Sequence, residues 1–238
     1  MLLGYNTNGL AHHDLLDAMM LLAEIGYRGV AITLDHGTLN PFDERCDDQL
    51  EQVTETLEKH NLRCVIETGA RFLLDPRAKH EPTLVSSDPA GRTRRVDFLC
   101  KAIEIAACLN ADCVSLWSGI VRDGAGERES FSRLVGGLAD VLDHAERKNV
   151  VLAFEPEPGM LVDTLARYDD LLDELSVQRI DASRLRLTID IGHLHCQREG
   201  PIAEEMAAIE VEKHRWLADR SGRVRTPLAI DTMPEFTP

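Results

Sequence analysis

The sequence predicts an α/β protein of the (β/α)8 barrel class, incomplete because strands seven and eight are missing or atypical. Apolar, β-branched runs typical of buried strands alternate with segments whose apolar residues follow helical spacing. Polar residues end every apolar run, and no GxGxxG motif follows the first run. Apolar strands joined by helices indicate a parallel sheet covered on both faces, and the polar strand ends favour a barrel over a doubly wound sheet.

The apolar runs predict six strands, because each run is continuous and ends in polar or glycine-containing sequence. In chain order the predicted strands lie within 2–9, 28–37, 63–70, 112–119, 150–159 and 185–193. The helices that separate them include 12–25, 47–60, 97–109 and 127–147. Asp14 and Asp47 lie in or near first helical turns, where a negative charge complements the helix dipole. These units assign 1–209 to the barrel and leave 210–238 as an atypical C-terminal tail.

The composition excludes several classes of partner. The formal net charge of -15 argues against a large basic surface, so neither nucleic acid nor a membrane is expected as a partner. The six cysteines form no CxxC pair and are interpreted as reduced core thiols. The first residues lack the basic and apolar segments of a signal peptide, which predicts a cytoplasmic protein.

The longest irregular stretch, 75–95, is rich in proline, glycine and serine and follows the third predicted strand. In a barrel it would lie on the catalytic face as a loop or a lid. Its arginines Arg92, Arg94 and Arg95 could receive a phosphate or a carboxylate group. A solvated charged loop is the alternative interpretation.

Two carboxylates end consecutive predicted strands, Glu155 in VVLAFEPEPG and Asp190 in LRLTIDIGH. A barrel would aim both at one central space, where they would repel each other unless a cation joined them. His193 follows Asp190 by three residues, and oxygen and imidazole ligands together suit a divalent Mn, Co, Zn or Mg ion. The alternatives are a helix cap for Asp190 and an ordinary polar side chain for His193.

Other residues at predicted strand ends could line a substrate pocket, namely Asn6, His36, Glu67, Trp117 and Glu157. Glu157 is separated from Glu155 by one proline and would supply a second carboxylate, unless it faces solvent as loop glutamates commonly do. Trp117 would form an apolar wall for a sugar or would only pack in the core.

The stretches AFEPEPG and LTIDIGHLHC, with the opening EIGYRGVAITL, resemble the xylose isomerase-like TIM-barrel family. The resemblance covers 1–209 in layout, and its specific motifs are the fifth and sixth strands. It implies that Glu155 and Asp190 bind a divalent metal and that Glu155 and His193 are catalytic. Glu155 would be a metal ligand and could act as the base, and His193 would contact substrate oxygens. The family holds sugar isomerases, sugar epimerases, inosose dehydratases and, more distantly, apurinic endonucleases.

The resemblance therefore implies a divalent-metal-dependent isomerase or epimerase acting on a sugar or sugar-like polyol. The metal would hold neighbouring carbonyl and hydroxyl oxygens and stabilise the enediolate formed when a proton leaves the carbon between them. The expected partner is a small-molecule carbohydrate. A dehydratase of a cyclic polyol is the nearest enzymatic alternative, whereas phosphodiester cleavage is disfavoured by the acidic charge.

The chain departs from the family pattern after residue 209. The family completes its metal site with a histidine on strand seven and a glutamate on strand eight, whereas this tail is polar and offers only PLAID as a short strand. Three explanations stay open: His214 and Asp231 as substitute ligands, a C-terminal quarter lost or altered by a frame change, which is favoured, or a second chain closing the barrel as a homo-oligomer. A catalytically impaired barrel that only binds a metabolite or a partner is accordingly the alternative function.

Overall fold

The computed structural model describes residues 2–197 and 228–231, which form one parallel sheet with helices around it. The strands are β1 (Leu2–Asn6), β2 (Gly29–Thr33), β3 (Arg63–Glu67), β4 (Val114–Leu116), β5 (Leu152–Phe154), β6 (Leu185–Leu187) and β7 (Leu228–Asp231). The helices are α1 (Leu15–Ile25), α2 (Cys46–His60), α3 (Pro89–Cys108), α4 (Glu127–Lys148), α5 (Leu165–Val177) and α6 (Ile191–Gln197), with a 3-10 turn η1 (Thr7–Leu10) after β1. All six predicted strands are therefore present.

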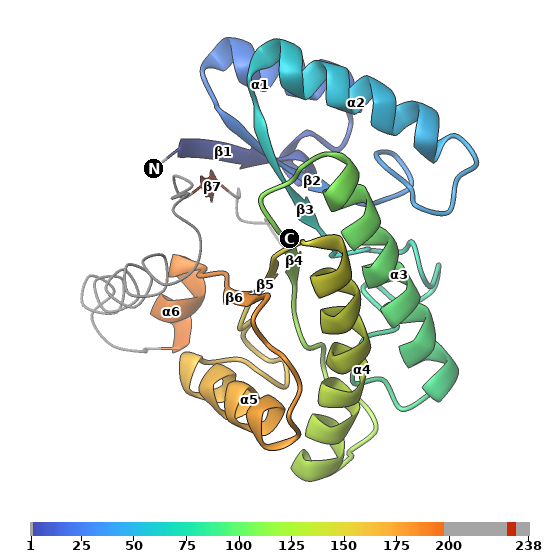
Figure 1. The fold of residues 1–238 in the computed structure, drawn as a ribbon, viewed down its shortest axis with the longest axis vertical. Helices are drawn as coiled ribbons and strands as arrows, with labels where there is room; N and C mark the ends of the chain where they lie inside the picture. Colours follow the sequence, from blue (N-terminus) through green and yellow to red (C-terminus); the bar gives the residue numbers. More distant parts are fainter. Residues whose placement is uncertain (1, 198–227, 232–238) are drawn as a thin grey trace.

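The strands follow the order β6-β5-β4-β3-β2-β1-β7, and every pair is parallel. Figure 1 shows the sheet curving like part of a barrel wall, with α1 to α5 spread around its outer side. All five residues of β2 are buried, because the helices cover one face of the sheet and its curvature encloses the other. The carboxyl ends of the strands, where barrel enzymes carry their sites, consequently face one common space.

The helix boundaries follow their capping residues. Asp14 caps α1 by accepting a hydrogen bond from the backbone N–H of Leu16, and Gly26 ends the helix with a left-handed φ of 113°. Asp47 lies in the first turn of α2, as predicted. Apolar side chains of each helix face the sheet and build one continuous core, for example Val53 and Leu138. Local sequence signals thus account for where most helices begin and end.

Helix α3 begins at Pro89, well before the predicted position at 97, so the prediction of an irregular stretch to 95 is wrong. Asp88 caps the helix through the N–H groups of Ala90 and Gly91, and Pro89 occupies the first helical turn. The Asp-Pro pair was therefore a helix start signal within a stretch that its proline, glycine and serine content marked as a loop. Arg92, Arg94 and Arg95 consequently lie on a helix.

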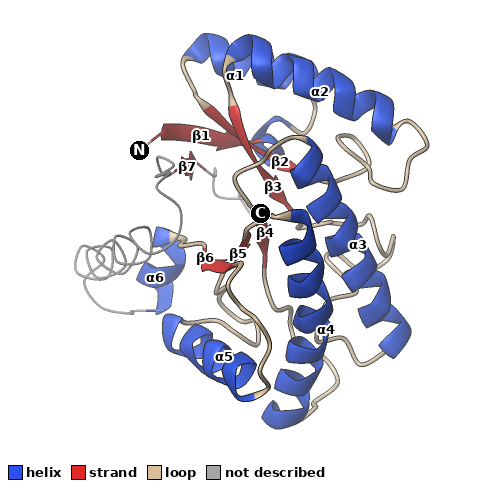
Figure 2. Cartoon of the chain, in the orientation of Figure 1, coloured by secondary structure: helices blue, strands red, loops and turns tan. Residues whose placement is uncertain are grey.

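Strand β7 confirms PLAID as a short strand and places it beside β1, with Leu2 opposite Leu228 and Tyr5 opposite Asp231. Figure 2 shows this short strand next to β1, which is where the last strand of a closed barrel lies. Within the described residues, β6 and β7 form the two edges of the sheet, in agreement with an incomplete barrel. His214 lies outside the described residues, and the domain boundary at 209 stays a prediction.

None of the described helices combines the length and the apolar character that a membrane span requires. The six cysteines are all unpaired, as predicted, and Cys64 is buried. Cys108 and Cys196 are exposed, so the expectation that the cysteines lie in the core is wrong for these two.

Candidate metal centre

Glu155 directly follows β5, and its backbone is fixed to the neighbouring strand. Its N–H group donates a hydrogen bond of 2.8 Å to the carbonyl oxygen of Leu116, the last residue of β4. Pro156 comes next and limits the backbone to extended conformations. The side chain is 19% exposed. The Glu155 carboxyl is therefore held at the carboxyl end of the sheet and is largely removed from water.

Asp190 and His193 lie at the junction of β6 and α6. The Asp190 carboxylate accepts a hydrogen bond of 3.0 Å from the N–H of His193, so it caps this short helix. A Cβ at position 192 would lie only 3.0 Å from the same Asp190 oxygen, which explains the glycine there. The cap interpretation of Asp190 is correct, and the other carboxylate oxygen of Asp190 lies 3.7 Å from Nε2 of His193.

The imidazole of His193 lies between the two carboxylates. Its Nδ1 is 3.6 Å from Oε1 of Glu155, and its Nε2 is 3.7 Å from Oδ2 of Asp190. One ligand atom from each of the three side chains lies within 4.8 Å of the others. Nδ1 of His193 is buried and has no hydrogen-bond partner. Two carboxylates and one imidazole, which has an unsatisfied ring nitrogen, form a donor set that fits a divalent cation.

The electrostatics of this end of the sheet also fit a cation. Burial, together with repulsion from Glu67, Glu157 and Asp190, raises the pKa of Glu155 to about 8. Burial and repulsion from Glu157 raise the pKa of Glu67 to about 7. Carboxyl groups whose charges are this unfavourable are stabilised by a bound divalent ion, which removes the repulsion between them.

Two further predicted residues belong to the same neighbourhood. Glu67 is the last residue of β3 and is partly buried. Glu157 is partly buried, and its charge acts on both Glu67 and Glu155, so it lies on the site side of its loop. The N–H of Glu157 donates a hydrogen bond of 3.2 Å to the carbonyl oxygen of Val162, which closes the loop after β5.

The remaining predicted pocket residues have other surroundings. Asn6 is buried at the end of β1, where its side-chain oxygen accepts hydrogen bonds from Asn8 N–H and from the Thr33 hydroxyl. His36 is exposed in the loop after β2. Trp117 directly follows β4 and is 9% exposed, with most of its ring packed against other side chains. Substrate roles for these three residues stay predictions.

Two residues contact Trp117: Arg95, which was predicted to receive an anion, and His80, which the sequence did not single out. The guanidinium group of Arg95 lies 4.5 Å from the centre of the indole, and the ring of His80 meets its edge with centroids 5.8 Å apart. Nδ1 of His80 lies 2.7 Å from the carbonyl oxygen of Gly69, so this nitrogen carries the proton. His80 also has a left-handed φ of 67°. A helix that starts at Pro89 places Arg95 on its buried face, so the orientation of Arg95 could have been predicted only from that start.

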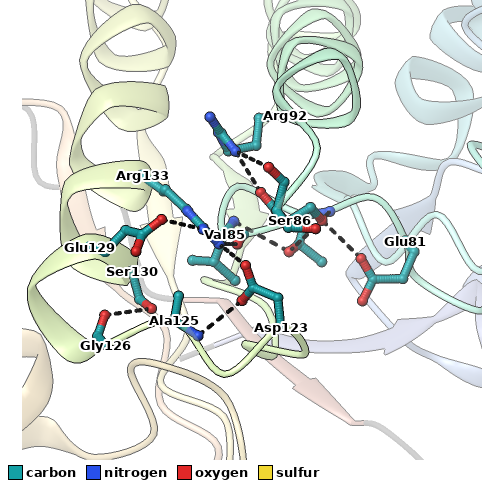
Figure 3. Close-up of polar contacts among 12 residues, drawn as sticks. Glu81, Val85, Ser86, Arg92, Asp123, Ala125, Gly126, Glu129, Ser130 and Arg133 are labelled. Atoms are coloured by element: carbon teal, nitrogen blue, oxygen red, sulfur yellow. Dashed lines mark hydrogen bonds and ion pairs between the residues drawn. The ribbon is translucent and has the colours of Figure 1, made fainter.

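The arginines predicted to receive an anion donate instead to backbone carbonyl oxygens of the β3–α3 loop. Arg92 donates to Ser86 at 2.7 Å, and Arg133 of α4 reaches Val85 of the same loop while pairing with Asp123 at 2.8 Å (Figure 3). These contacts tie the loop to α3 and α4. This arrangement argues against the predicted lid. We refer to residues 71–88, together with Arg92, Arg94, Arg95 and Arg133, as the arginine rim.

Arg94 and Arg95 complete the arginine rim from the same helix. Arg94 donates to the carbonyl oxygen of Leu74 at 3.3 Å, and Arg95 donates to that of Thr68 at 2.9 Å. The alternative of a solvated charged loop does not hold for Arg95, because Arg95 is 1% exposed. The three arginines are close together in the sequence, but they donate to carbonyl oxygens at separate positions along the β3–α3 loop.

The chain matches a protein-family model. Residues 20–226 match the model of the xylose isomerase-like TIM barrel family, and this range covers most of the chain. No curated protein matches the chain.

Comparison with solved structures gives similar folds at low sequence identity. The 3-keto-D-glucoside 4-epimerase YcjR from E. coli has a TM-score of 0.69 at 12% identity, over 88% of this chain and 75% of that structure. A D-allulose 3-epimerase from Methylomonas sp., in complex with D-allulose, has a TM-score of 0.63 at 19% identity, over 82% and 64%. The IolI protein with a bound zinc atom has a TM-score of 0.63 at 18% identity, also over 82% and 64%. The chain thus spans about two thirds of the length of these structures.

Proposed function

The chain belongs to the xylose isomerase-like TIM-barrel family, and we propose that it is a divalent-metal-dependent isomerase or epimerase of a sugar or sugar-like polyol. The observation that carries this proposal is the convergence of Glu155, Asp190 and His193, whose ligand atoms lie within 4.8 Å of one another. The sugar epimerases among the structures of similar fold support the substrate class.

The proposed reaction assigns a task to each side chain of the centre. Glu155, Asp190 and His193 would hold the ion, which supplies electrophilic polarisation of neighbouring carbonyl and hydroxyl oxygens of the sugar. Glu155 is the proposed base that removes the proton from the carbon between those oxygens and leaves an enediolate. His193 is the proposed contact to the sugar oxygens. The metal is Mn, Mg, Co or Zn.

The fate of the proton decides between isomerase and epimerase. Return of the proton to the neighbouring carbon moves the carbonyl group and gives an isomer. Return to the same carbon from the opposite face inverts that centre and requires a second proton-transfer group. We propose Glu67 or Glu157 for this group, because both carboxyl groups lie near enough to Glu155 for their charges to raise its pKa.

Two measurements on the purified chain test the proposal. Metal analysis after expression should find a divalent ion in the parent protein and much less in Glu155→Gln and Asp190→Asn. Incubation with a panel of ketoses in D2O, with Mn, Co, Mg or Zn added in turn, should place solvent deuterium on a carbon of at least one sugar. A chain that binds no divalent ion and exchanges no proton of any sugar would overturn the proposal.

The second candidate is an impaired barrel that binds a metabolite or a partner without turnover. The observation that favours it is the open sheet, in which β6 and β7 are edges within the described residues. The absence of a bound divalent ion, together with the absence of deuterium exchange in every ketose of the panel, would favour this candidate. A dehydratase of a cyclic polyol is distinguished from both candidates by the mass of the product, because loss of water removes about 18 Da whereas isomerisation changes no mass.

A further inference from the structure

Arg95 is almost completely buried, whereas Arg94, which also donates to a carbonyl oxygen of the loop, is exposed. The side chain of Arg95 is 1% exposed, whereas arginine is rarely buried completely without a paired charge. Nη2 donates one hydrogen bond of 2.9 Å to the carbonyl oxygen of Thr68, and the buried Nη1 has no hydrogen-bond partner. The opposing charge that acts on it, that of Glu81, is itself paired with Arg122 at 2.8 Å.

The guanidinium group instead packs on two aromatic rings. It lies 4.5 Å from the ring centre of Trp117 and 5.3 Å from that of Phe98. Phe98 is fully buried on the same helix, so it fixes the arginine from behind. His80 meets the edge of Trp117, with ring planes inclined by 86°. Trp117 is therefore held by a cation on its face and by an imidazole at its edge.

Stability alone does not account for a guanidinium group at this place. A buried charge that lacks a charged partner loses its hydration, and replacing such a group by an apolar side chain of similar volume is often neutral or stabilising. What the guanidinium does achieve is a link between three elements. It joins α3 to Thr68, the residue after Glu67 at the end of β3, and to Trp117 at the end of β4.

We propose that Arg95 is a positioning residue for substrate binding, which holds the indole of Trp117 and the end of β3 in the places where they meet the sugar. This inference rests on the proposed function, because it takes Trp117 as a wall of the sugar site. Arg95 itself reaches no substrate, since it is 1% exposed. It acts through the orientation of Trp117 and, by the Thr68 carbonyl oxygen, through the backbone that carries Glu67.

A fluorescence comparison tests the physical half of this inference without any substrate. The chain has two tryptophans, so a Trp216→Phe background leaves Trp117 as the only emitter. Arg95→Met removes the cation at similar volume, and Arg94→Met is the matched control, because Arg94 is an exposed neighbour on α3 that also donates to a loop carbonyl oxygen. Acrylamide quenching of Trp117 should rise about twofold or more in Arg95→Met and stay at the parent value in Arg94→Met.

Steady-state kinetics test the functional half, using the sugar that exchanges deuterium fastest with the parent. Arg95→Met should raise KM on the order of tenfold, with a smaller change in kcat. A displaced Trp117 indole weakens the binding of the sugar more than it affects the proton transfer. In a Trp117→Phe background, Arg95→Met should add no further increase in KM, since Arg95 acts through the indole. Arg94→Met should leave KM unchanged.

Several outcomes would overturn the inference. Quenching and KM that are the same in Arg95→Met and Arg94→Met would do so, and so would KM effects of Arg95→Met and Trp117→Phe that simply multiply. If Arg95→Met does not fold by circular dichroism, Arg95→Lys replaces it, because lysine keeps the charge but loses the flat face that stacks on the indole. If no sugar reacts with the parent, the proposed function fails, and the quenching comparison alone decides whether Arg95 holds Trp117.

Discussion

Two charged regions lie at the carboxyl ends of the strands, and they use their charges in opposite ways. In the arginine rim, Arg92, Arg94 and Arg133 donate to backbone carbonyl oxygens and ion pairs, so that one loop is fixed to two helices. In the candidate metal centre, Glu155 and Asp190 face the same imidazole, whose Nδ1 is buried without a hydrogen-bond partner. These three arginines support the loop, and the unsatisfied nitrogen of the metal centre marks the place where a ligand is expected.

The largest expected effect follows from removing a carboxylate of the metal centre. Asp190→Asn and Glu155→Gln keep the volume but remove the charge that attracts the ion, so metal affinity should fall at least about a hundredfold and activity should be lost with it. Isothermal titration with Mn²⁺ measures the affinity. Glu24→Gln, an exposed change on α1, is the control that should bind as the parent does. Equal affinity in all four proteins would show that the ion binds elsewhere.

The second effect concerns the packing of Gly119 against Thr83 of the arginine rim. Gly119 has a left-handed φ of 97°, and a Cβ there would overlap the side chain of Thr83. Gly119→Ala should therefore lower the free energy of unfolding by about 2 to 5 kcal/mol, from backbone strain and overpacking together. Urea unfolding measures this change, with metal removed by a chelator.

Gly136→Ala provides the control for that substitution. Gly136 lies within α4, and a Cβ there would meet no atom within 4 Å. The same replacement should raise the free energy of unfolding by about 0.5 to 1 kcal/mol, because alanine favours the helix. If both variants were equally stable, the contact between Gly119 and Thr83 would not be the tight one described.

The third effect concerns pH and comes from the centre alone. Burial raises the folded-state pKa of Glu67 to about 7, above the ordinary value of 4.5. The stability that protonation of Glu67 supplies is thus fully present below pH 4.5 and is lost as the pH rises through 7. Metal-free protein should become less stable between pH 5 and pH 8, and Glu67→Gln should reduce that decline without abolishing it, because the raised pKa of Glu155 contributes to it as well. Urea unfolding at several pH values measures it, and a decline of the same size in both proteins would contradict the assignment.

The smallest expected effect comes from a single arginine of the rim. Arg133→Met removes the bonds to Val85 and Asp123, which are partly accessible to water, so the melting temperature should fall by a few degrees. Metal affinity should remain at the parent value, because Arg133 acts on the loop and not on the centre. A fall in metal affinity would mean that the two regions are coupled.

The sequence predicted the barrel class and the positions of Glu155, Asp190 and His193, because periodicity and strand-end chemistry are local signals. The start of α3 was missed because Pro89 lies in a stretch rich in loop-forming residues, although Asp88 and Pro89 together are a capping signal. The inward orientation of Arg95 depends on that start.

Other features depend on distant parts of the chain and leave no local signal. The pairing of β7 with β1 joins the two ends of the chain, so PLAID could be predicted as a strand but not placed in the sheet. The same limit applies to the carboxyl groups of Glu67 and Glu155, whose mutual repulsion exists only once β3 and β5 lie in one barrel wall.

A crystal structure of the chain grown with Mn²⁺ tests the central claim most directly, because anomalous scattering locates the ion without assumptions. The account predicts one strong peak between Glu155, Asp190 and His193, with ligand atoms at about 2.0 to 2.6 Å from it. A peak that contacts none of these side chains, or carboxyl groups of Glu155 and Asp190 that turn away from each other in the presence of the ion, would contradict it.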